Sequence, residues 1–314
     1  MNPQQRIDSF YENFVLPDVD YDQWFSAEEK AKIKDANYFK EQVKNLQLNP
    51  DSERGLRLPF NKTNDFRIRS GESTIHTGYN GHRKSMMLGY IQLGLIAQGE
   101  KCLTVSLEMQ PKRTLDRQLK QFAGNDEPTL PIHDQFFNFV KGQLFIYDQL
   151  GTVNWKRVIG VCRYAINELG VTQCFLDSLM KFGIKKKDLE TQAEFVDEMT
   201  TLGKDTGAHM HLVAHANKPM EGREDKPPSK YDVSGNADLT NMVDNVLIHH
   251  KVNEEKVKDN GFNQYMFTGK QRNPEGEDSE PVYGFCFQSN SLQFKSFKTA
   301  QRMDIDDWLN GRFI

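Results

Sequence analysis

Short apolar segments alternate with amphipathic helical patterns from residue 66 onward, and this alternation constrains the fold more than any other feature. The apolar segments have the length of buried strands and cover residues 73–77, 103–107, 144–147, 173–177 and 209–214. The helical patterns cover residues 85–98, 112–122, 155–169 and 192–206. Strands that alternate with helices form a parallel sheet, because each connecting helix returns the chain across one face of the sheet. We therefore predict an α/β fold with a mostly parallel sheet and helices on both faces.

The pattern changes near the C-terminal end. Four apolar segments follow one another without an intervening helical pattern, at residues 243–250, 264–269, 282–288 and 292–294. Consecutive strands with short connections pair as antiparallel hairpins. We expect these strands to extend the parallel sheet on its C-terminal side.

Three parts of the chain differ in composition. Residues 1–65 begin with an aromatic and acidic stretch, continue with a helical pattern at 26–48, and end in a turn-rich connection. This appendage and linker helix either docks on a neighbouring subunit or packs on its own domain. We expect the α/β domain at 66–300 and an acidic tail at 301–314. The 314 residues suit one large domain with a small appendage.

The charge balance excludes some classes of protein. A net charge of −4 and a pI near 6.1 exclude a globally basic nucleic-acid binder, although a few local loops remain able to grip DNA. No window approaches the ~18 apolar residues of a membrane span, and no signal-peptide pattern begins the chain, so we expect a cytoplasmic protein without membrane contact. The four scattered cysteines form no C-x-x-C pair, which favours free thiols over disulfides or zinc ligands.

A glycine-containing segment between the first strand and its helix has the pattern of a phosphate-binding loop. Its residues are Gly78, Tyr79, Asn80, Gly81, His82, Arg83, Lys84 and Ser85. In such a loop the backbone N–H groups and the helix N-terminus face the phosphates, the lysine reaches the β- and γ-phosphates, and the serine binds Mg²⁺. We therefore expect ATP and Mg²⁺ as cofactors.

Arg83 departs from the usual loop pattern, because glycine normally precedes the lysine. A non-glycine residue costs roughly 1–2 kcal/mol if the position needs a positive φ. We expect the Arg83 side chain to contact phosphate or to point into solvent.

Three further strands end in polar side chains. Glu108 closes one strand and is suited to polarise the attacking water. Asp177 closes another and is suited to organise Mg²⁺ beside Ser85, although an aspartate that caps a turn is common. His215 follows a third strand and is suited to sense the γ-phosphate, although a lone histidine there is more often structural. Ligands of open α/β sheets collect at the carboxyl ends of strands, so we expect these three side chains to share one site.

The order of these motifs resembles that of the DnaB-like and Twinkle-like replicative helicases, including the helicase halves of phage primase–helicases. The resemblance covers approximately residues 58–294. Its matching pieces are Gly71-Glu72 with the phosphate loop, Ser-Leu-Glu108-Met, Leu-Asp177-Ser, the strand before His215, Gly235-Asn-Ala-Asp-Leu with Asp244-Asn, and Lys270-Gln-Arg272-Asn. It implies a RecA-like ATPase that forms a hexameric ring, unwinds DNA by moving on single-stranded DNA, and serves phage or prophage replication in a bacterial host cell without a primase of its own.

The resemblance also implies roles for individual residues. Glu108 would be the catalytic base and His215 the phosphate sensor. Lys270 and Arg272 would reach into the nucleotide site of the next subunit. The long polar segment 218–236 would contact the DNA backbone with the residues Lys226, Ser229, Lys230 and Asn236.

Two other functions remain open at this point. A recombinase-type RecA-like ATPase would share the fold and the site but would not unwind DNA. A weak-turnover, nucleotide-dependent DNA-binding module is suggested by Arg83. The acidic tail either binds a replisome partner through Trp308, Phe313 and Ile314 or packs on its own domain.

Overall fold

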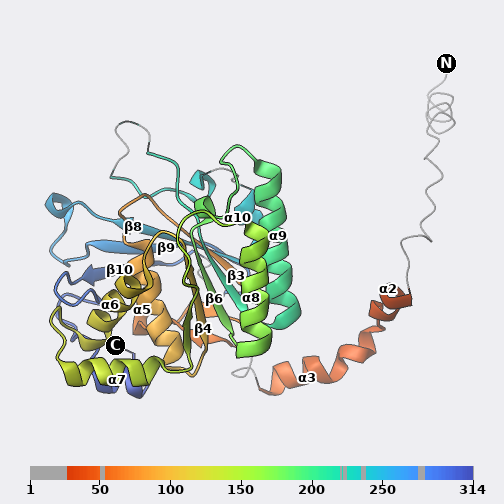
Figure 1. The fold of residues 1–314 in the computed structure, drawn as a ribbon, viewed down its shortest axis with the longest axis horizontal. Helices are drawn as coiled ribbons and strands as arrows, with labels where there is room; N and C mark the ends of the chain where they lie inside the picture. Colours follow the sequence, from red (N-terminus) through yellow and green to blue (C-terminus); the bar gives the residue numbers. More distant parts are fainter. Residues whose placement is uncertain are drawn as a thin grey trace. The chain divides into compact units, whose positions relative to one another are not determined.

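The computed structural model describes residues 27–49, 54–219, 221, 225–234, 238–274 and 280–313. The chain divides into two compact units, residues 1–53 and 54–314. In the first unit the described residues form helices α2 (Ala27–Lys32), η2 (Ala36–Phe39) and α3 (Lys40–Leu48). The second unit contains every strand that the structure describes (Figure 1).

The second unit is built on a nine-stranded sheet in the order β11-β10-β9-β8-β3-β7-β6-β4-β5. Six neighbouring strands are parallel, namely β8 (Asn245–Lys251), β3 (Ser73–Thr77), β7 (His209–Val213), β6 (Gln173–Asp177), β4 (Cys102–Ser106) and β5 (Leu144–Ile146). Three antiparallel strands continue from β8, namely β9 (Gln264–Gln271), β10 (Val282–Phe287) and β11 (Phe294–Lys295). The predicted mostly parallel sheet with antiparallel strands on its C-terminal side is confirmed.

Helices cover both faces of the sheet (Figure 1). One face carries α8 (Trp155–Leu169) and α9 (Leu189–Thr206), and the other carries α5 (Lys84–Ile96), α6 (Pro111–Ala123) and α7 (Leu130–Val140). Each face has its own buried apolar cluster, with Cys162 and Phe195 in the first and Ile91 and Phe122 in the second. Helix α7 was missing from the sequence-based expectation.

Local sequence signals explain where these helices begin and end. Asn154 and Asp188 cap α8 and α9, since their side chains accept hydrogen bonds from the first-turn N–H groups of Lys156 and Thr191. Both helices, like α6, end at a glycine with positive φ, and these glycines are Gly124, Gly170 and Gly207.

Two predicted boundaries need correction. The compact unit begins at residue 54, because Leu58 and Phe60 of the expected appendage are buried in its core. This stretch includes η3 (Asn61–Thr63) and strand β1 (Leu56–Arg57), which pairs with β2 (Arg67–Ile68). At the other end, α11 (Ile305–Leu309) carries a fully buried Trp308. The segment expected as a tail therefore packs on the domain, and Ile314 lies outside the described residues.

A row of buried histidines crosses the middle of the sheet. His76 bonds to His249 on one side and to His211 on the other, and both nitrogen–nitrogen distances are 3.1 Å. The row ends at Gln173, whose Nε2 donates to Glu100 and whose Oε1 accepts from His211 Nε2 at 3.2 Å. Each ring therefore donates through Nε2 and is neutral. Burial lowers the pKa of all three histidines, that of His249 to about 3.

Candidate nucleotide-binding site

The predicted phosphate-binding loop connects β3 to α5 and lies at the edge where the parallel strands end. Gly78 has φ +149°, and a Cβ there would lie 2.3 Å from the carbonyl oxygen of His249 on the neighbouring strand β8. Only glycine lets the backbone approach β8 this closely. Gly81 has φ +78° with open space around it. The two glycines thus shape the loop for different reasons, close packing and a left-handed turn.

Lys84 is buried at the start of α5. Its Nζ donates to the carbonyl oxygens of Gly78 and Tyr79 at 2.8 and 2.9 Å. Burial lowers the pKa of Lys84 to about 8, while the carboxylates of Asp177 and Glu108 act in the opposite direction. The ammonium group therefore lies inside the loop, where a bound phosphate would be its natural partner.

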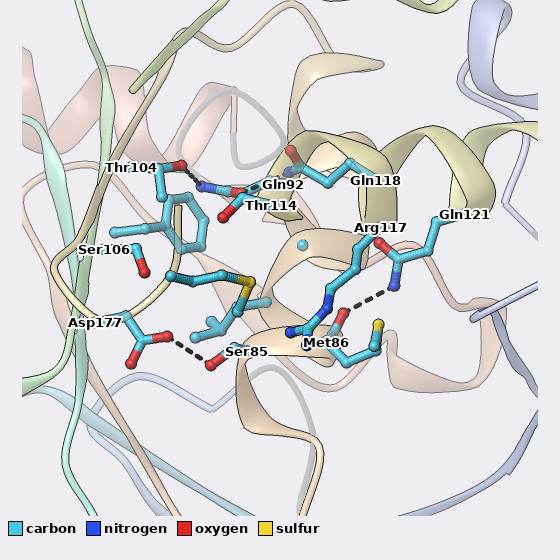
Figure 2. Close-up of a pocket in the computed structure, with 14 residues that line it drawn as sticks. Ser85, Met86, Gln92, Thr104, Ser106, Thr114, Arg117, Gln118, Gln121 and Asp177 are labelled. Carbon is cyan, nitrogen blue, oxygen red and sulfur yellow. Dashed lines mark hydrogen bonds between the residues drawn. The ribbon is translucent and has the colours of Figure 1, made fainter. Parts of the chain in front are cut away.

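Ser85, the residue after Lys84, faces Asp177 (Figure 2). Ser85 Oγ donates to Asp177 Oδ2 at 2.5 Å, which brings the first turn of α5 against the end of β6. Burial raises the pKa of Asp177, and the bond from Ser85 lowers it. A hydroxyl and a carboxylate side by side form an oxygen donor set of the kind that Mg²⁺ prefers. These two residues therefore fit the predicted metal site.

Glu108 and His215 face the same cleft, which has a volume of about 630 Å³. Ser178 Oγ donates to Glu108 Oε1 at 3.1 Å, so the residue after Asp177 fixes the carboxylate that follows β4. Burial, together with the charge of Lys84, lowers the pKa of His215. Its Nδ1 is buried and has no hydrogen-bond partner among the described residues. The phosphate loop and the three strand-end residues therefore converge on one cleft. Lys84, Ser85, Glu108 and His215 line it, and Asp177 is bonded to Ser85.

Arg83 has φ +60°, the left-handed conformation that costs a non-glycine residue roughly 1–2 kcal/mol. Its guanidinium lies 4.2 Å from the ring centroid of Phe287 on β10. Its Nη1 also donates to Asn263 O at 3.3 Å and lies 3.5 Å from Gln264 Oε1. The Arg83 side chain therefore packs on the antiparallel strands and does not point freely into solvent. These contacts offset part of the backbone cost. Arg83 still lines the cleft, and its expected contact with phosphate stays a prediction.

His82 ties the loop to the same strands. Its Nδ1 accepts a hydrogen bond from Lys251 N at 3.1 Å, and its carbonyl accepts from Gln264 Nε2 at 3.3 Å. Burial, together with the charges of His250, Lys84 and Lys251, lowers the pKa of His82 to about 4. The ring is therefore neutral and acts as a hydrogen-bond acceptor for the backbone of the adjacent strand.

Arg117 is a site residue that the sequence reasoning missed. It lines the nucleotide cleft and also a smaller cavity between α5, α6 and the sheet, where Figure 2 shows it beside Ser85 and Met86. Its charge lowers the pKa of Asp177. Thr114, Arg117, Gln118 and Gln121 line that cavity together because they share one face of α6 at helical spacing. That spacing was readable in the sequence.

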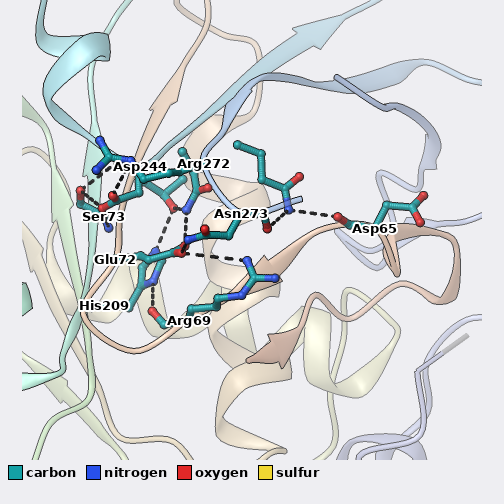
Figure 3. A network of polar contacts seen from close by, with 11 residues as sticks. Asp65, Arg69, Glu72, Ser73, His209, Asp244, Arg272 and Asn273 are labelled. Atoms are coloured by element: carbon teal, nitrogen blue, oxygen red, sulfur yellow. Dashed lines mark hydrogen bonds and ion pairs between the residues drawn. The ribbon is translucent and has the colours of Figure 1, made fainter. Parts of the chain in front are cut away.

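The basic pair Lys270 and Arg272 lies away from this cleft. Strand β9 is antiparallel to β8, and its last residue Gln271 pairs with Asn245, the first residue of β8. The pair therefore sits where the parallel strands begin, as Figure 3 shows for Arg272 beside Ser73. The chain needs five residues of β3 to reach Gly78 from Ser73, roughly 16 Å at a strand's rise. The two basic residues do not join the nucleotide site of their own chain.

The predicted DNA-contact residues form a separate group. Ser229 Oγ donates to Asp232 Oδ2 at 2.8 Å within η5 (Lys230–Asp232), and Lys230 Nζ lies 3.5 Å from Glu280 Oε1. Lys226 is exposed. Asn236 and Gly235 lie outside the described residues. The segment expected as one long loop therefore contains the short helix η5. An antiparallel bridge between Ala216 and Val233 also joins its two ends.

Comparisons with known proteins place the fold. No family model matches the chain. A Twinkle homolog of Arabidopsis thaliana, assigned to chloroplasts and mitochondria, is 26% identical over 114 residues, which are 35% of this chain and 16% of that protein. The chain thus matches less than a fifth of the length of this relative. No helix among the described residues is long and apolar enough to cross a membrane.

Two solved structures superpose on most of the chain. One is an ATPase domain with a TM-score of 0.70 and 12% identity, and the match covers 83% of this chain and 99% of that one. The other is a DnaB-like replicative helicase studied with its primase, also with a TM-score of 0.70 and 12% identity, covering 93% of this chain and 74% of that one. The chain therefore has the RecA-like fold of DnaB-like replicative helicase ATPase domains, as its motif order predicts.

Proposed function

We propose that this chain is an ATP-driven motor that moves on single-stranded DNA and unwinds duplex DNA, working as a ring of identical subunits in phage or prophage replication inside a bacterial host cell. The observation that carries the proposal is the convergence of Lys84, Ser85, Asp177 and Glu108 on one cleft. A lysine, an oxygen pair for Mg²⁺ and a second carboxylate are the groups that phosphoryl transfer to water requires.

Each residue would have a distinct task in hydrolysis. Lys84 binds the phosphates by its charge, and Ser85 with Asp177 would hold Mg²⁺, which neutralises charge on the phosphates. Glu108 accepts a hydrogen bond from Ser178 through Oε1, so its second oxygen remains to orient the attacking water and accept its proton. His215 lies in the same cleft and would contact the terminal phosphate through its unpartnered ring nitrogen.

The position of Lys270 and Arg272 supports an assembly of several copies. These residues lie at the opposite end of the sheet from their own phosphate loop, so they can act on a nucleotide only in an adjacent copy. An arginine supplied in this way is worth roughly 10³–10⁵ in rate in related phosphoryl transfers. A closed ring, for which we propose six subunits, would give every site such a partner.

The segment 218–236 would contact DNA through phosphates, with Lys226 and Lys230 as its cations. The division into an appendage, a motor domain and a C-terminal segment is part of the proposal, with the motor domain beginning at residue 54.

Unwinding of a forked DNA substrate, measured with and without ATP, tests the proposal. Strand separation that needs ATP and is lost in Glu108→Gln supports it. ATP hydrolysis without strand separation would favour a recombinase-type ATPase. The left-handed Arg83 is the one observation that favours a weak-turnover DNA-binding module, and hydrolysis that DNA does not stimulate would support that function.

A further inference from the structure

The segment that links α10 (Leu239–Met242) to β8 encloses the basic pair. Lys270 Nζ donates to the carbonyl oxygens of Thr240, Asn241 and Val243 at 3.0, 3.0 and 2.6 Å. Three backbone acceptors satisfy all three protons of the ammonium group. Lys270 is therefore held by its own chain in a defined place, and Arg272 is the member of the pair that remains to reach a neighbouring copy.

The next residue, Asp244, holds the second cation. Its Oδ1 lies 3.2 Å from Arg272 Nε, and its backbone carbonyl accepts from Arg272 N at 3.1 Å. Its other oxygen, Oδ2, accepts from the backbone N and the Oγ of Ser73 at 2.9 and 3.0 Å. Figure 3 shows Asp244 between Ser73 and Arg272. The Asp244 side chain is only 7% exposed, so this carboxylate is itself fixed.

The geometry of the Arg272 contact leaves one edge of the guanidinium available. The Arg272–Asp244 ion pair is formed through Nε, and the described residues show no hydrogen bond from either Nη nitrogen. The side chain is 51% exposed. A guanidinium binds phosphate best through two parallel N–H groups, and the Nη edge supplies such a pair.

The residue after Arg272 is also anchored. Glu72 accepts from Asn273 Nδ2 at 2.7 Å through Oε1 and from Asn245 Nδ2 at 2.9 Å through Oε2. The backbone on both sides of Arg272 is thus tied to the starts of β3 and β8. What remains free is the outer end of the side chain.

We propose that Asp244 is a positioning residue, which orients Arg272 so that its Nη edge meets a phosphate of the nucleotide bound by an adjacent copy of this chain. The proposal rests on the proposed function and adds a residue that touches neither the nucleotide nor the reacting atoms. If Asp244 merely secured the start of β3, its loss would harm the subunit's own nucleotide site and not the site of the neighbour.

Mixed assemblies separate these two roles. In the reference mixture one chain carries Arg272→Ala and supplies a sound nucleotide site, and the other carries Lys84→Ala and supplies a sound arginine. Each alone is expected to be inactive, and the mixture is expected to regain ATP hydrolysis. Adding Asp244→Asn to the Lys84→Ala chain changes the arginine donor, and adding it to the Arg272→Ala chain changes the site donor. Thermal unfolding of each variant checks its folding.

We expect the regained rate to fall roughly 10²-fold when Asp244→Asn is in the arginine donor, because a small misplacement of a catalytic group costs about that much. In the site donor the same change is expected to leave the regained rate within about threefold. Equal losses in both positions, or a loss only in the site donor, would overturn the proposal. A reference mixture that regains nothing would overturn the trans assignment in the proposed function, and the present proposal with it.

Arg272→Lys in the arginine donor provides a variant that does not depend on how Asp244→Asn folds. Lysine keeps the charge but cannot offer an Nε group to Asp244 and a two-pronged edge to phosphate at once. We expect the regained rate to fall at least tenfold. A regained rate equal to that of the reference mixture would show that charge alone suffices and that no oriented guanidinium is needed.

Discussion

Ser85 Oγ and Asp177 Oδ2 lie 2.5 Å apart although 92 residues separate them in the chain. The contact joins the first turn of α5 to the end of β6, across the edge where the nucleotide cleft opens. Hydroxyl and carboxylate therefore stand side by side, so the proposed Mg²⁺ site would need little rearrangement to bind the ion.

Lys84 and Glu108 should fail in different ways when they are replaced. Lys84→Ala removes the cation directed at phosphate, so both ATP affinity and turnover should fall. Glu108→Gln should leave ATP affinity nearly unchanged and slow hydrolysis by about 10²-fold or more, because the water loses its base. Titration with a fluorescent ATP analogue and a phosphate-release assay measure the two properties. Glu127→Gln, an exposed carboxylate elsewhere, serves as the control. Unchanged turnover in Glu108→Gln would remove that residue from the mechanism.

Arg83→Gly restores the usual residue of such loops. The change relieves the left-handed strain at φ +60° but loses the contact with Phe287, so the two effects oppose each other. We expect ATP affinity to stay within about tenfold of the parent, an effect near 1.4 kcal/mol. Phe287→Leu, which removes the ring and keeps the strain, should be the more harmful of the two. A rise in turnover by orders of magnitude in Arg83→Gly would identify the parent as an impaired ATPase.

The segment around η5 should grip DNA by charge. Replacing Lys226 and Lys230 with alanine should weaken binding of single-stranded DNA and reduce its salt dependence, while basal ATP hydrolysis survives. Fluorescence anisotropy at several salt concentrations measures both effects. The matched control replaces the exposed Lys141 and Lys156, which lie on other parts of the domain. Equal effects from the two pairs would show that the η5 segment has no special role in DNA binding.

The C-terminal segment should contribute to folding. Trp308 is fully buried against the ring of Tyr90, with 5.0 Å between the ring centroids, so Trp308→Ala should lower the free energy of unfolding by about 3–5 kcal/mol. Leu309→Ala, at a neighbouring residue that is 53% exposed, should cost much less. Urea unfolding compares the two. Native stability in the Trp308 variant would mean that this helix does not contribute to the core, and it would return the segment to the role of a partner-binding tail.

The histidine row should make stability depend on pH. A histidine whose pKa is lower in the folded than in the unfolded chain binds fewer protons when folded, so stability is complete above about pH 6.5 and falls as the pH drops below that value. Each such histidine contributes up to about 1.4 kcal/mol per pH unit. His76→Gln keeps a donor and an acceptor without the titration. Its loss of stability between pH 7.5 and 5.5 should be smaller than that of the parent by about 1 kcal/mol in urea unfolding. His133→Gln, outside the row, should follow the parent.

Local patterns in the sequence predicted the sheet well, and residues that they marked line one cleft. The strands at 73–77 and 173–177 and the helix at 155–169 agree with the structure residue by residue, because apolar periodicity and glycine ends are local signals. The loop residues and the carboxylates at strand ends converge because parallel strands end at one edge. Even Glu72, noted only for its motif, has a clear place beside Asn245 and Asn273.

Long-range packing was beyond the reach of the same reasoning. The stacking of Arg83 on Phe287 joins residues from opposite ends of the domain, and no local pattern marks it. The burial of Phe60 and Trp308 likewise depends on distant partners. Polar residues surround both side chains in the sequence, so each segment has the composition of a surface segment. Arg117 was missed for a different reason. It lies on helix α6, whereas the predicted site residues lie in the phosphate loop and at the ends of strands.

The antiparallel course of β9 also determines what symmetry an assembly can have. The arginine and the cleft lie at opposite ends of one sheet, so a contact in which Arg272 of one copy meets the cleft of the next would be head-to-tail. A two-fold dimer cannot satisfy both surfaces at once. Such a contact closes into a ring when its rotation per copy divides a full turn and the rise is zero, and otherwise continues as a helical filament. A small rise between neighbours would turn a closed ring into an open spiral, with one unpaired cleft at one end and one unused arginine at the other.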